Sequence, residues 1–287
     1  MARDRAEAPA FRWGDLRKRI ASAAVLAPLA LAAIWLGAAA WAAVIGVMTL
    51  GLACEWAQLC GFRASGVPGL LVPGSVLVSG AAAVAGYEKA ALVLLLAGFA
   101  GLLVLARELA PGSSERGARS AASLAAGVLY VGLASVAIVW LRNDPIAGRP
   151  NVLFLVLIVW ASDVGAYVAG RLIGGPRLAP RISPGKTWAG AIGGLAAGIG
   201  IGLLVAAWTT GAEGLWRIAP VAGLLAAVAQ LGDLIESLIK RRFGVKDSSR
   251  LIPGHGGLLD RLDGMLTAAP AAALLALAIG RGVVLWR

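Results

Sequence analysis

Histidine and cysteine are almost absent from the sequence, which contains one histidine, His255, and two cysteines, Cys54 and Cys60. A structural zinc site takes four Cys or His ligands, and a disulfide framework takes several cysteine pairs. These counts exclude both kinds of site. We expect Cys54 and Cys60 to be small apolar side chains in or near a helix.

Charged residues are also scarce, at 14% of 287 residues, whereas hydrophobic residues make up 59%. A soluble domain of this size would need more polar side chains to cover its surface. The composition therefore predicts an all-α polytopic integral membrane protein. The net charge of +11 does not by itself indicate a nucleic-acid partner, because basic residues beside membrane spans favour cytoplasmic loops and anionic lipid headgroups.

About nine apolar stretches are long enough to cross a bilayer, which takes about twenty residues each. Residues 1–19 hold six basic side chains. We expect a retained first helix after them, because the apolar core of a cleaved signal peptide is shorter. The expected spans are Ile20–Leu36, Ala38–Ala57, Val67–Gly86, Ala90–Ala106, Ala121–Leu141, Val152–Ile173, Trp188–Thr209, Ile218–Ile239 and Leu266–Trp286.

The positions of the basic residues predict the orientation of these spans. With a cytoplasmic N-terminus, twenty of the twenty-six Lys and Arg residues fall on the cytoplasmic side and six on the other. Such a bias is typical of membrane proteins. We therefore expect a multi-pass protein of the cell inner membrane.

The densest run of charge begins at Asp233, between two apolar spans. Asp233, Glu236, Ser237 and Lys240 are spaced i, i+3, i+4 and i+7, which places them on one face of a helix. Charge so close to a bilayer costs free energy and usually marks a functional site.

A glycine-rich turn and two further acids complete this run. Residues 253–257 read Pro-Gly-His-Gly-Gly, and glycines there permit backbone shapes that other residues resist and expose N–H groups. Asp260 and Asp263 follow at i, i+3. Both carboxylates can face the same way if a helix begins at this point.

Two upstream features are also polar. Asp163 lies inside an apolar span, where an acid normally faces a polar cavity and a cation, although a purely structural pairing with a neighbouring helix stays open. Ser183-Pro-Gly-Lys-Thr187 resembles the end of a P-loop, but Pro180 replaces the required glycine and no strand is expected before it. Lys186 and the two hydroxyls, just ahead of a helix, still suit an anion.

These side chains suit one kind of chemistry. Carboxylates without a histidine cluster favour Mg²⁺, and lysines and arginines beside them favour phosphate oxygens. Together they indicate metal-assisted phosphoryl or nucleotidyl transfer. A simple positive-inside flank would explain Lys240, Arg241 and Arg242, but it would not explain Asp233, Asp260 and Asp263.

The segment from Ser237 to Asp263 resembles the signature of the phosphatidate cytidylyltransferases, also called CDP-diacylglycerol synthases. The match extends over 27 positions. Its fixed residues are Ser237, Lys240, Arg241, Lys246, Asp247, Pro253, Gly254, His255, Gly256, Gly257, Asp260, Arg261 and Asp263.

Two upstream motifs are similar to those of the same family and occur in the same order. Asp163 with Gly165-Ala-Tyr167 and Gly170 matches the first, and Ser183-Pro184 with Lys186-Thr187 matches the second. Gly185 stands where the family has a lysine, and Ala189 stands where it often has an acid. The resemblance covers the first hundred residues only in general character.

The resemblance implies an integral membrane enzyme that joins CTP and phosphatidate to give CDP-diacylglycerol and pyrophosphate with Mg²⁺. It implies Asp233, Asp260 and Asp263 as metal ligands, and these acids with Lys240 as the catalytic residues. His255 would bond a phosphate or order the glycine turn. The substrate-binding residues would be Asp163, Ser183, Lys186, Thr187, Ser237, Arg241, Lys246, Asp247, His255 and Arg261.

The same resemblance implies the organisation and partners of the chain. Residues 1–19 would be a basic cytoplasmic segment, 20–110 N-terminal transmembrane helices, and 111–287 a C-terminal transmembrane catalytic region whose site faces the cytoplasm. The partners would be the two substrates and the lipid bilayer, without nucleic acid. A second, monovalent cation and a homodimer stay open.

Three other functions are alternatives. A CDP-alcohol phosphotransferase requires two more acids downstream of Asp263, and residues 265–287 contain none. An ion-coupled transporter that uses Asp163 and Asp233 predicts related halves and broken helices, which the sequence does not show. A CTP-dependent lipid kinase, which transfers the γ-phosphate, is separated only by the long signature.

Overall fold

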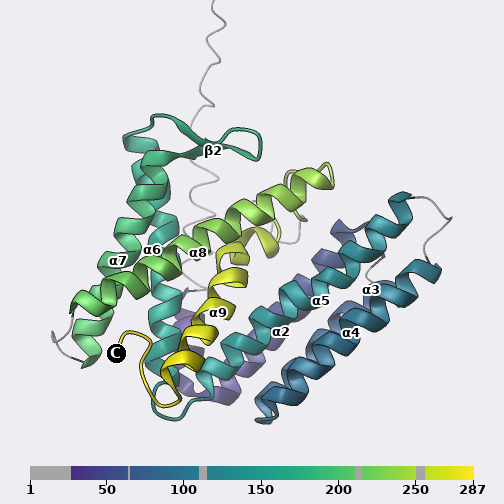
Figure 1. Cartoon of the computed structure of the whole chain (residues 1–287), viewed down its shortest axis with the longest axis horizontal. Helices are drawn as coiled ribbons and strands as arrows, with labels where there is room; N and C mark the ends of the chain where they lie inside the picture. The colour runs from purple at the N-terminus through teal and green to yellow at the C-terminus, as the bar shows by residue number, and fades with distance from the viewer. Residues whose placement is uncertain (1–26, 64, 110–114, 211–214, 250–255) are drawn as a thin grey trace, which may run out of the picture.

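The computed structural model describes residues 27–63, 65–109, 115–210, 215–249 and 256–287. These parts contain eight helices that are long and apolar enough to cross a membrane, and a shorter apolar helix, Ala27–Leu36, precedes them (Figure 1). The prediction of an all-α polytopic membrane protein is confirmed. The helices are α2 (Ala38–Leu59), α3 (Val67–Val84), α4 (Glu88–Leu109), α5 (Glu115–Arg142), α6 (Gly148–Leu172), α7 (Trp188–Thr210), α8 (Leu215–Arg242) and α9 (Leu259–Ile279).

Charged residues extend the helices beyond their apolar stretches. α8 continues past the predicted Ile239 to Arg242, because basic side chains in a last turn interact favourably with the helix dipole. The predicted span Leu266–Trp286 is wrong at both ends. α9 begins seven residues earlier, at Leu259, with an acid in its first turn, and it ends at Ile279 before Gly280, whose φ is 110°. Residues 1–19 and the start of the first predicted span lie outside the described residues.

A small β-hairpin, which the sequence did not predict, interrupts the helices. β1 (Arg177–Ala179) pairs antiparallel with β2 (Ser183–Thr187) between α6 and α7. The prediction that no strand precedes the Ser183–Thr187 motif is therefore wrong. Gly174 and Gly175 have φ values of 68° and 95° after α6 ends, a conformation that favours glycine and turns the chain into the hairpin. The hairpin projects beyond the helix ends (Figure 1).

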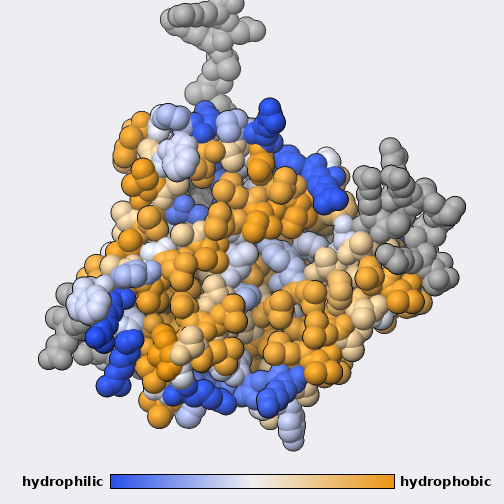
Figure 2. All heavy atoms as spheres, in the orientation of Figure 1, coloured by the Kyte–Doolittle hydropathy of each residue, from blue (hydrophilic) through white to orange (hydrophobic). Residues whose placement is uncertain are grey.

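Two apolar cores hold the helices together. One contains Trp56 and Leu124 and lies mainly among α2 to α5, and the other contains Phe154 and lies mainly among α6 to α9, with Trp41 of α2 and Leu141 of α5. α9 contributes to both, through Leu266 in the first and Ala272 in the second. The two groups of helices stand side by side in Figure 1. Figure 2 shows an apolar band across the middle of the visible face, with hydrophilic side chains gathered toward its ends, as expected for membrane helices.

Small residues bring α6 and α7 into close contact. A Cβ on Gly193 would lie 2.2 Å from the Cβ of Ala169, and one on Gly165 would lie 2.5 Å from the Cβ of Ala197. Glycine is therefore required for the two backbones to approach this closely. The close packing fixes α6, which carries Asp163, against the helix that follows β2.

The residues after α9 fold back onto the start of α6. The N–H of Gly282 donates to Asp144, and that of Leu285 donates to Asn151. Burial raises the pKa of the Asp144 carboxyl, but hydrogen bonds from the backbone N–H groups of Ala147 and Gly282 outweigh it and hold the pKa below its usual value. The end of α9 opposite the site is thereby anchored.

Candidate active site

A cavity of about 490 Å³ opens where α6, the β-hairpin, α7, α8 and α9 meet. Its size lies within the range of small-molecule sites in proteins. Acidic and basic side chains from segments far apart in the sequence line it together. The charged lining residues are Asp163, Arg171, Lys186, Asp233, Asp260, Arg261 and Asp263.

Three carboxylates come together at this cavity. One oxygen each of Asp233 and Glu236, on α8, and of Asp263, on α9, all lie within 4.8 Å of one another. Opposite ligands of an octahedral Mg²⁺ ion stand about 4.2 Å apart, so this spacing suits one ion after small side-chain rotations. Glu236 is only 2% exposed, and its Oε1 has no hydrogen-bond partner among the residues that the structure describes. A buried carboxylate oxygen without a partner is costly, and a cation would satisfy it.

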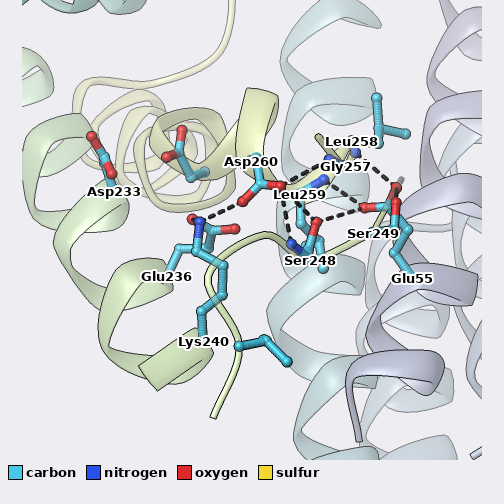
Figure 3. Close-up of polar contacts among 12 residues, drawn as sticks. Glu55, Asp233, Glu236, Lys240, Ser248, Ser249, Gly257, Leu258, Leu259 and Asp260 are labelled. Carbon is cyan, nitrogen blue, oxygen red and sulfur yellow. Dashed lines mark hydrogen bonds and ion pairs between the residues drawn. The ribbon is translucent and has the colours of Figure 1, made fainter. Parts of the chain in front are cut away.

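Two lysines form ion pairs with Asp233 and Glu236. The Nζ of Lys186, on β2, lies 2.6 Å from Oδ2 of Asp233. The Nζ of Lys240, on the last turn of α8, lies 2.8 Å from Oε2 of Glu236 and also contacts Oδ1 of Asp260 (Figure 3). The predicted helix face of Asp233, Glu236 and Lys240 therefore forms part of the site. An ammonium group has three donors, so each lysine can also bind an anion.

Asp260 joins the two described ends of the segment that connects α8 and α9, at Ser248 and at Gly257. Its Oδ2 accepts hydrogen bonds from the N–H of Ser248 at 3.0 Å, from the hydroxyl of Ser248 at 3.1 Å and from the N–H of Gly257 at 2.8 Å. Its Oδ1 faces Lys240. Both oxygens are therefore engaged, and a cation at Oδ1 requires Lys240 to move. The role of Asp260 as a metal ligand stays a prediction.

The two glycines before α9 are required by this arrangement. Gly256 has a φ of 78°, and a Cβ there would lie 2.9 Å from Oδ2 of Asp260. A Cβ on Gly257 would lie 1.8 Å from Oγ of Ser248 and 2.6 Å from Oε2 of Glu55. Distances this short leave no room for any side chain at Gly257.

Substitution of Gly257 by alanine is expected to destabilise the protein by about 1–3 kcal/mol, because the new methyl group overpacks a filled space. The thermal unfolding midpoint of the detergent-solubilised protein measures the effect. Gly200→Ala on α7 is the matched control, since a Cβ there meets no atom within 4 Å. Equal midpoints for the two variants would contradict the packing described for Gly257.

The upstream motifs reach the same cavity. The side chain of Asp163 is exposed to it, and four residues on, the hydroxyl of Tyr167 accepts a hydrogen bond from Arg171 at 3.1 Å. Thr187 lines the cavity, but its hydroxyl accepts the N–H of Gly190 at 3.0 Å. It therefore caps the start of α7.

Other predicted binding residues lie around the cavity. Arg261 lines it, whereas Arg241 donates to the backbone oxygen of Ile182 and so joins α8 to the hairpin. Lys246 and Asp247 are exposed on the segment after α8. Ser237 on α8 and Ser183 at the start of β2 are half-buried, and His255 lies outside the described residues. The substrate contacts of these residues stay predictions.

Sequence reasoning missed three contributors to the site. Glu236 was placed on the right helix face but was not predicted as part of the acidic group. The hydroxyl of Tyr130, on α5, is buried with no partner among the described residues, and its electrostatic neighbours are Glu236, Asp263 and Asp233. Glu55 on α2 is bonded to the connecting segment. An acid inside an apolar span, the signal that identified Asp163, also marks Glu55.

Comparison with known proteins finds similarity to cytidylyltransferases. A family model described as the cytidylyltransferase family matches residues 17–279. A phosphatidate cytidylyltransferase of Brucella suis is 41% identical over 258 residues, which cover 89% of this chain and 91% of that protein. A phosphatidate cytidylyltransferase of Pseudomonas aeruginosa is 38% identical over 271 residues, which cover 93% and 99%.

Proposed function

The chain belongs to the cytidylyltransferase family, and we propose that it transfers the CMP moiety of CTP to phosphatidate, giving CDP-diacylglycerol and pyrophosphate. The observation that best supports this function is that carboxylates and cationic side chains line one cavity at the end of membrane helices. The relatives described above are cytidylyltransferases, which supports neither the transporter nor the lipid kinase.

The reaction needs no nucleophile from the protein. A phosphate oxygen of phosphatidate attacks the α-phosphorus of CTP, and the bond from that phosphorus to the bridging oxygen of the β-phosphate breaks. Pyrophosphate leaves with the bonding electrons. Catalysis of this kind rests on positioning and on neutralising negative charge. This requirement agrees with the described lining of the cavity, which contains no serine or cysteine.

The cationic side chains are suited to the phosphate groups. Arg171, Lys186 and Arg261 line the cavity, and guanidinium and ammonium groups are the usual donors to phosphate oxygens. Lys240 contacts two acids of the site, Glu236 and Asp260. These residues would orient the two anionic substrates and reduce their repulsion.

We propose that the acidic group binds Mg²⁺. Asp233, Glu236 and Asp263 would hold the ion, because their oxygens lie close together and Glu236 has an unpartnered oxygen. When bound, the ion supplies charge neutralisation on the phosphate oxygens. A second, monovalent cation stays a prediction, for which Asp163 offers an exposed carboxylate in the same cavity.

The protein is a multi-pass membrane protein. We propose the cell inner membrane, with the site at the cytoplasmic face, because most of the basic residues lie on the site's side of the predicted spans and the relatives are bacterial. A water-soluble nucleotide and a membrane lipid meet at such a face. A homodimer and the lack of a nucleic-acid partner stay predictions.

Purified protein supplied with phosphatidate, Mg²⁺ and CTP labelled at the α- or the γ-phosphate tests the function. We expect the α label in the lipid product and the γ label in pyrophosphate. Removing the metal with EDTA is expected to lower the rate by at least about 100-fold, since the ion offsets charge in the transition state. Excess Mg²⁺ should restore the rate. Parallel reactions with and without K⁺ test whether the rate also depends on a monovalent cation.

The opposite labelling pattern would overturn the proposal. If the γ label enters the lipid, the protein is a CTP-dependent kinase. If EDTA leaves the rate unchanged, the acidic group does not bind a required metal.

A further inference from the structure

Glu55, near the end of α2, contacts both described ends of the segment between α8 and α9, although it belongs to the other group of helices. Its side chain is buried, with 2% exposure. Oε1 accepts hydrogen bonds from the hydroxyl of Ser249 at 2.6 Å and from the N–H of Leu258 at 2.8 Å. Oε2 accepts the N–H of Leu259 at 2.9 Å and lies 3.2 Å from the hydroxyl oxygen of Ser248. Figure 3 shows these contacts converging on one carboxylate.

These contacts replace the missing cap of α9. The first N–H groups of a helix have no partner within it and need an acceptor. Leu258, the residue at the cap position, has no side chain that can accept a hydrogen bond. Glu55 supplies the acceptor from α2, and its negative charge is also favourable at a helix N-terminus. The carboxylate therefore stabilises the start of α9 at Leu259.

The same contacts lead directly to the proposed active site. The hydroxyl of Ser248 lies between the two carboxylates, 3.2 Å from Oε2 of Glu55 and 3.1 Å from Oδ2 of Asp260. Asp260 follows Leu259 in the first turn of α9 and contacts Lys240, which contacts Glu236. A displacement at Glu55 is therefore transmitted through two contacts to Asp260 and through a third to Lys240.

The contacts also indicate what Glu55 does not do. Three hydrogens are donated to the carboxylate, two from the backbone N–H groups of Leu258 and Leu259 and one from the hydroxyl of Ser249, while the hydroxyl of Ser248, which donates to Asp260, stands 3.2 Å from Oε2. A carboxylate saturated with donors has the surroundings of a fixed anion and not those of a metal ligand. Glu55 also does not line the cavity, so it acts on the substrates only through other residues.

We propose that Glu55 is a positioning residue for the transfer reaction: it fixes the start of α9 and the segment at Ser248–Ser249, and thereby holds Asp260 and Lys240 in the geometry that the reaction requires. The inference rests on the proposed function. It assigns a role in catalysis to the N-terminal helices, where the family signature has no counterpart.

Glu55→Gln tests the inference with little change of shape. In either orientation of the amide, its NH₂ group faces the N–H of Leu258 or of Leu259, so one hydrogen bond becomes a contact between two donors. We expect kcat to fall about 10–100-fold, the range for residues that orient the groups of a site. Glu88→Gln, the same change in an exposed ion pair with Arg281, is the matched control and is expected to keep the native rate.

A double-mutant cycle with Asp260→Asn separates positioning from general stabilisation. If Glu55 acts through Asp260, adding Glu55→Gln to Asp260→Asn changes the residual rate by less than about threefold. A loss of the same factor in both backgrounds would show that Glu55 does not act through Asp260, and native kcat in Glu55→Gln would equally overturn the inference.

Hydrogen exchange tests Glu55 even if the proposed function fails. Glu55→Gln is expected to increase amide exchange in residues 256–262, while residues 165–172 of α6 exchange as in the native protein. Increased exchange throughout the chain, or unchanged exchange in 256–262, would contradict the local role. The labelled-CTP assay of the native protein tests the function separately.

Discussion

Replacing Asp263 by asparagine is expected to lower the rate of CDP-diacylglycerol formation by about 10³-fold, a loss typical of removing one charged group from a transition-state site. Asp263 is the contribution of α9 to the three-carboxylate group, and the other two acids come from α8. The asparagine side chain keeps the shape but removes the charge that a divalent cation requires. Initial rates with labelled CTP at several Mg²⁺ concentrations measure the effect.

The Mg²⁺ series gives this experiment its second readout. A weakened metal site requires more Mg²⁺ for half-maximal rate, so the concentration at half-maximum should rise in Asp263→Asn. Glu88→Gln provides the control for carboxylate loss away from the site, where an exposed ion pair contributes little. A native rate in Asp263→Asn would contradict the proposal that this acidic group binds the metal required for the reaction.

Replacing Asp260 by asparagine is expected to lower the rate by about 10²–10³-fold, a range typical of losing one preorganised charged contact. Oδ2 accepts three hydrogen bonds and Oδ1 faces Lys240. An amide therefore places an NH₂ group against other donors in either orientation. Unmatched buried donors cost free energy, so we expect Ser248, Gly257 or Lys240 to shift away from the amide.

The response of Asp260→Asn to Mg²⁺ distinguishes two roles for this residue. Partial recovery at raised Mg²⁺ would support the predicted metal ligand. A rate that stays low at every Mg²⁺ concentration would assign Asp260 to holding Lys240 and the glycine turn. A native rate would contradict both roles and with them the central position of the segment between α8 and α9.

Local patterns predicted much of the fold and of the site. Apolar stretches located eight of the spans, because length and composition alone qualify a helix to cross a bilayer. The i, i+3, i+7 spacing of Asp233, Glu236 and Lys240 predicted a shared helix face, and these side chains do lie together. As expected, an acid of α8, Asp233, also lies close to an acid of α9, Asp263.

Contacts between distant segments could not be predicted in the same way. The start of α9 depends on Glu55, about two hundred positions away, so the apolar pattern alone placed it too late. The engagement of Asp260 by Ser248 and Gly257 depends on the path of the connecting segment. The hairpin at Ser183 is short and polar, and a short polar strand lacks the alternating hydrophobic pattern that strand prediction uses.

The dependence of α9 on Glu55 has a consequence for how the protein is made. Ser248 and Leu259 are synthesised 193 and 204 residues after Glu55. During that interval Glu55 lies in an apolar helix without the donors that later surround it, and an intramembrane acid without partners is unstable. We therefore expect α2 to reach its full stability only after α9 is in place, so that the N-terminal helices and the proposed active site depend on one another.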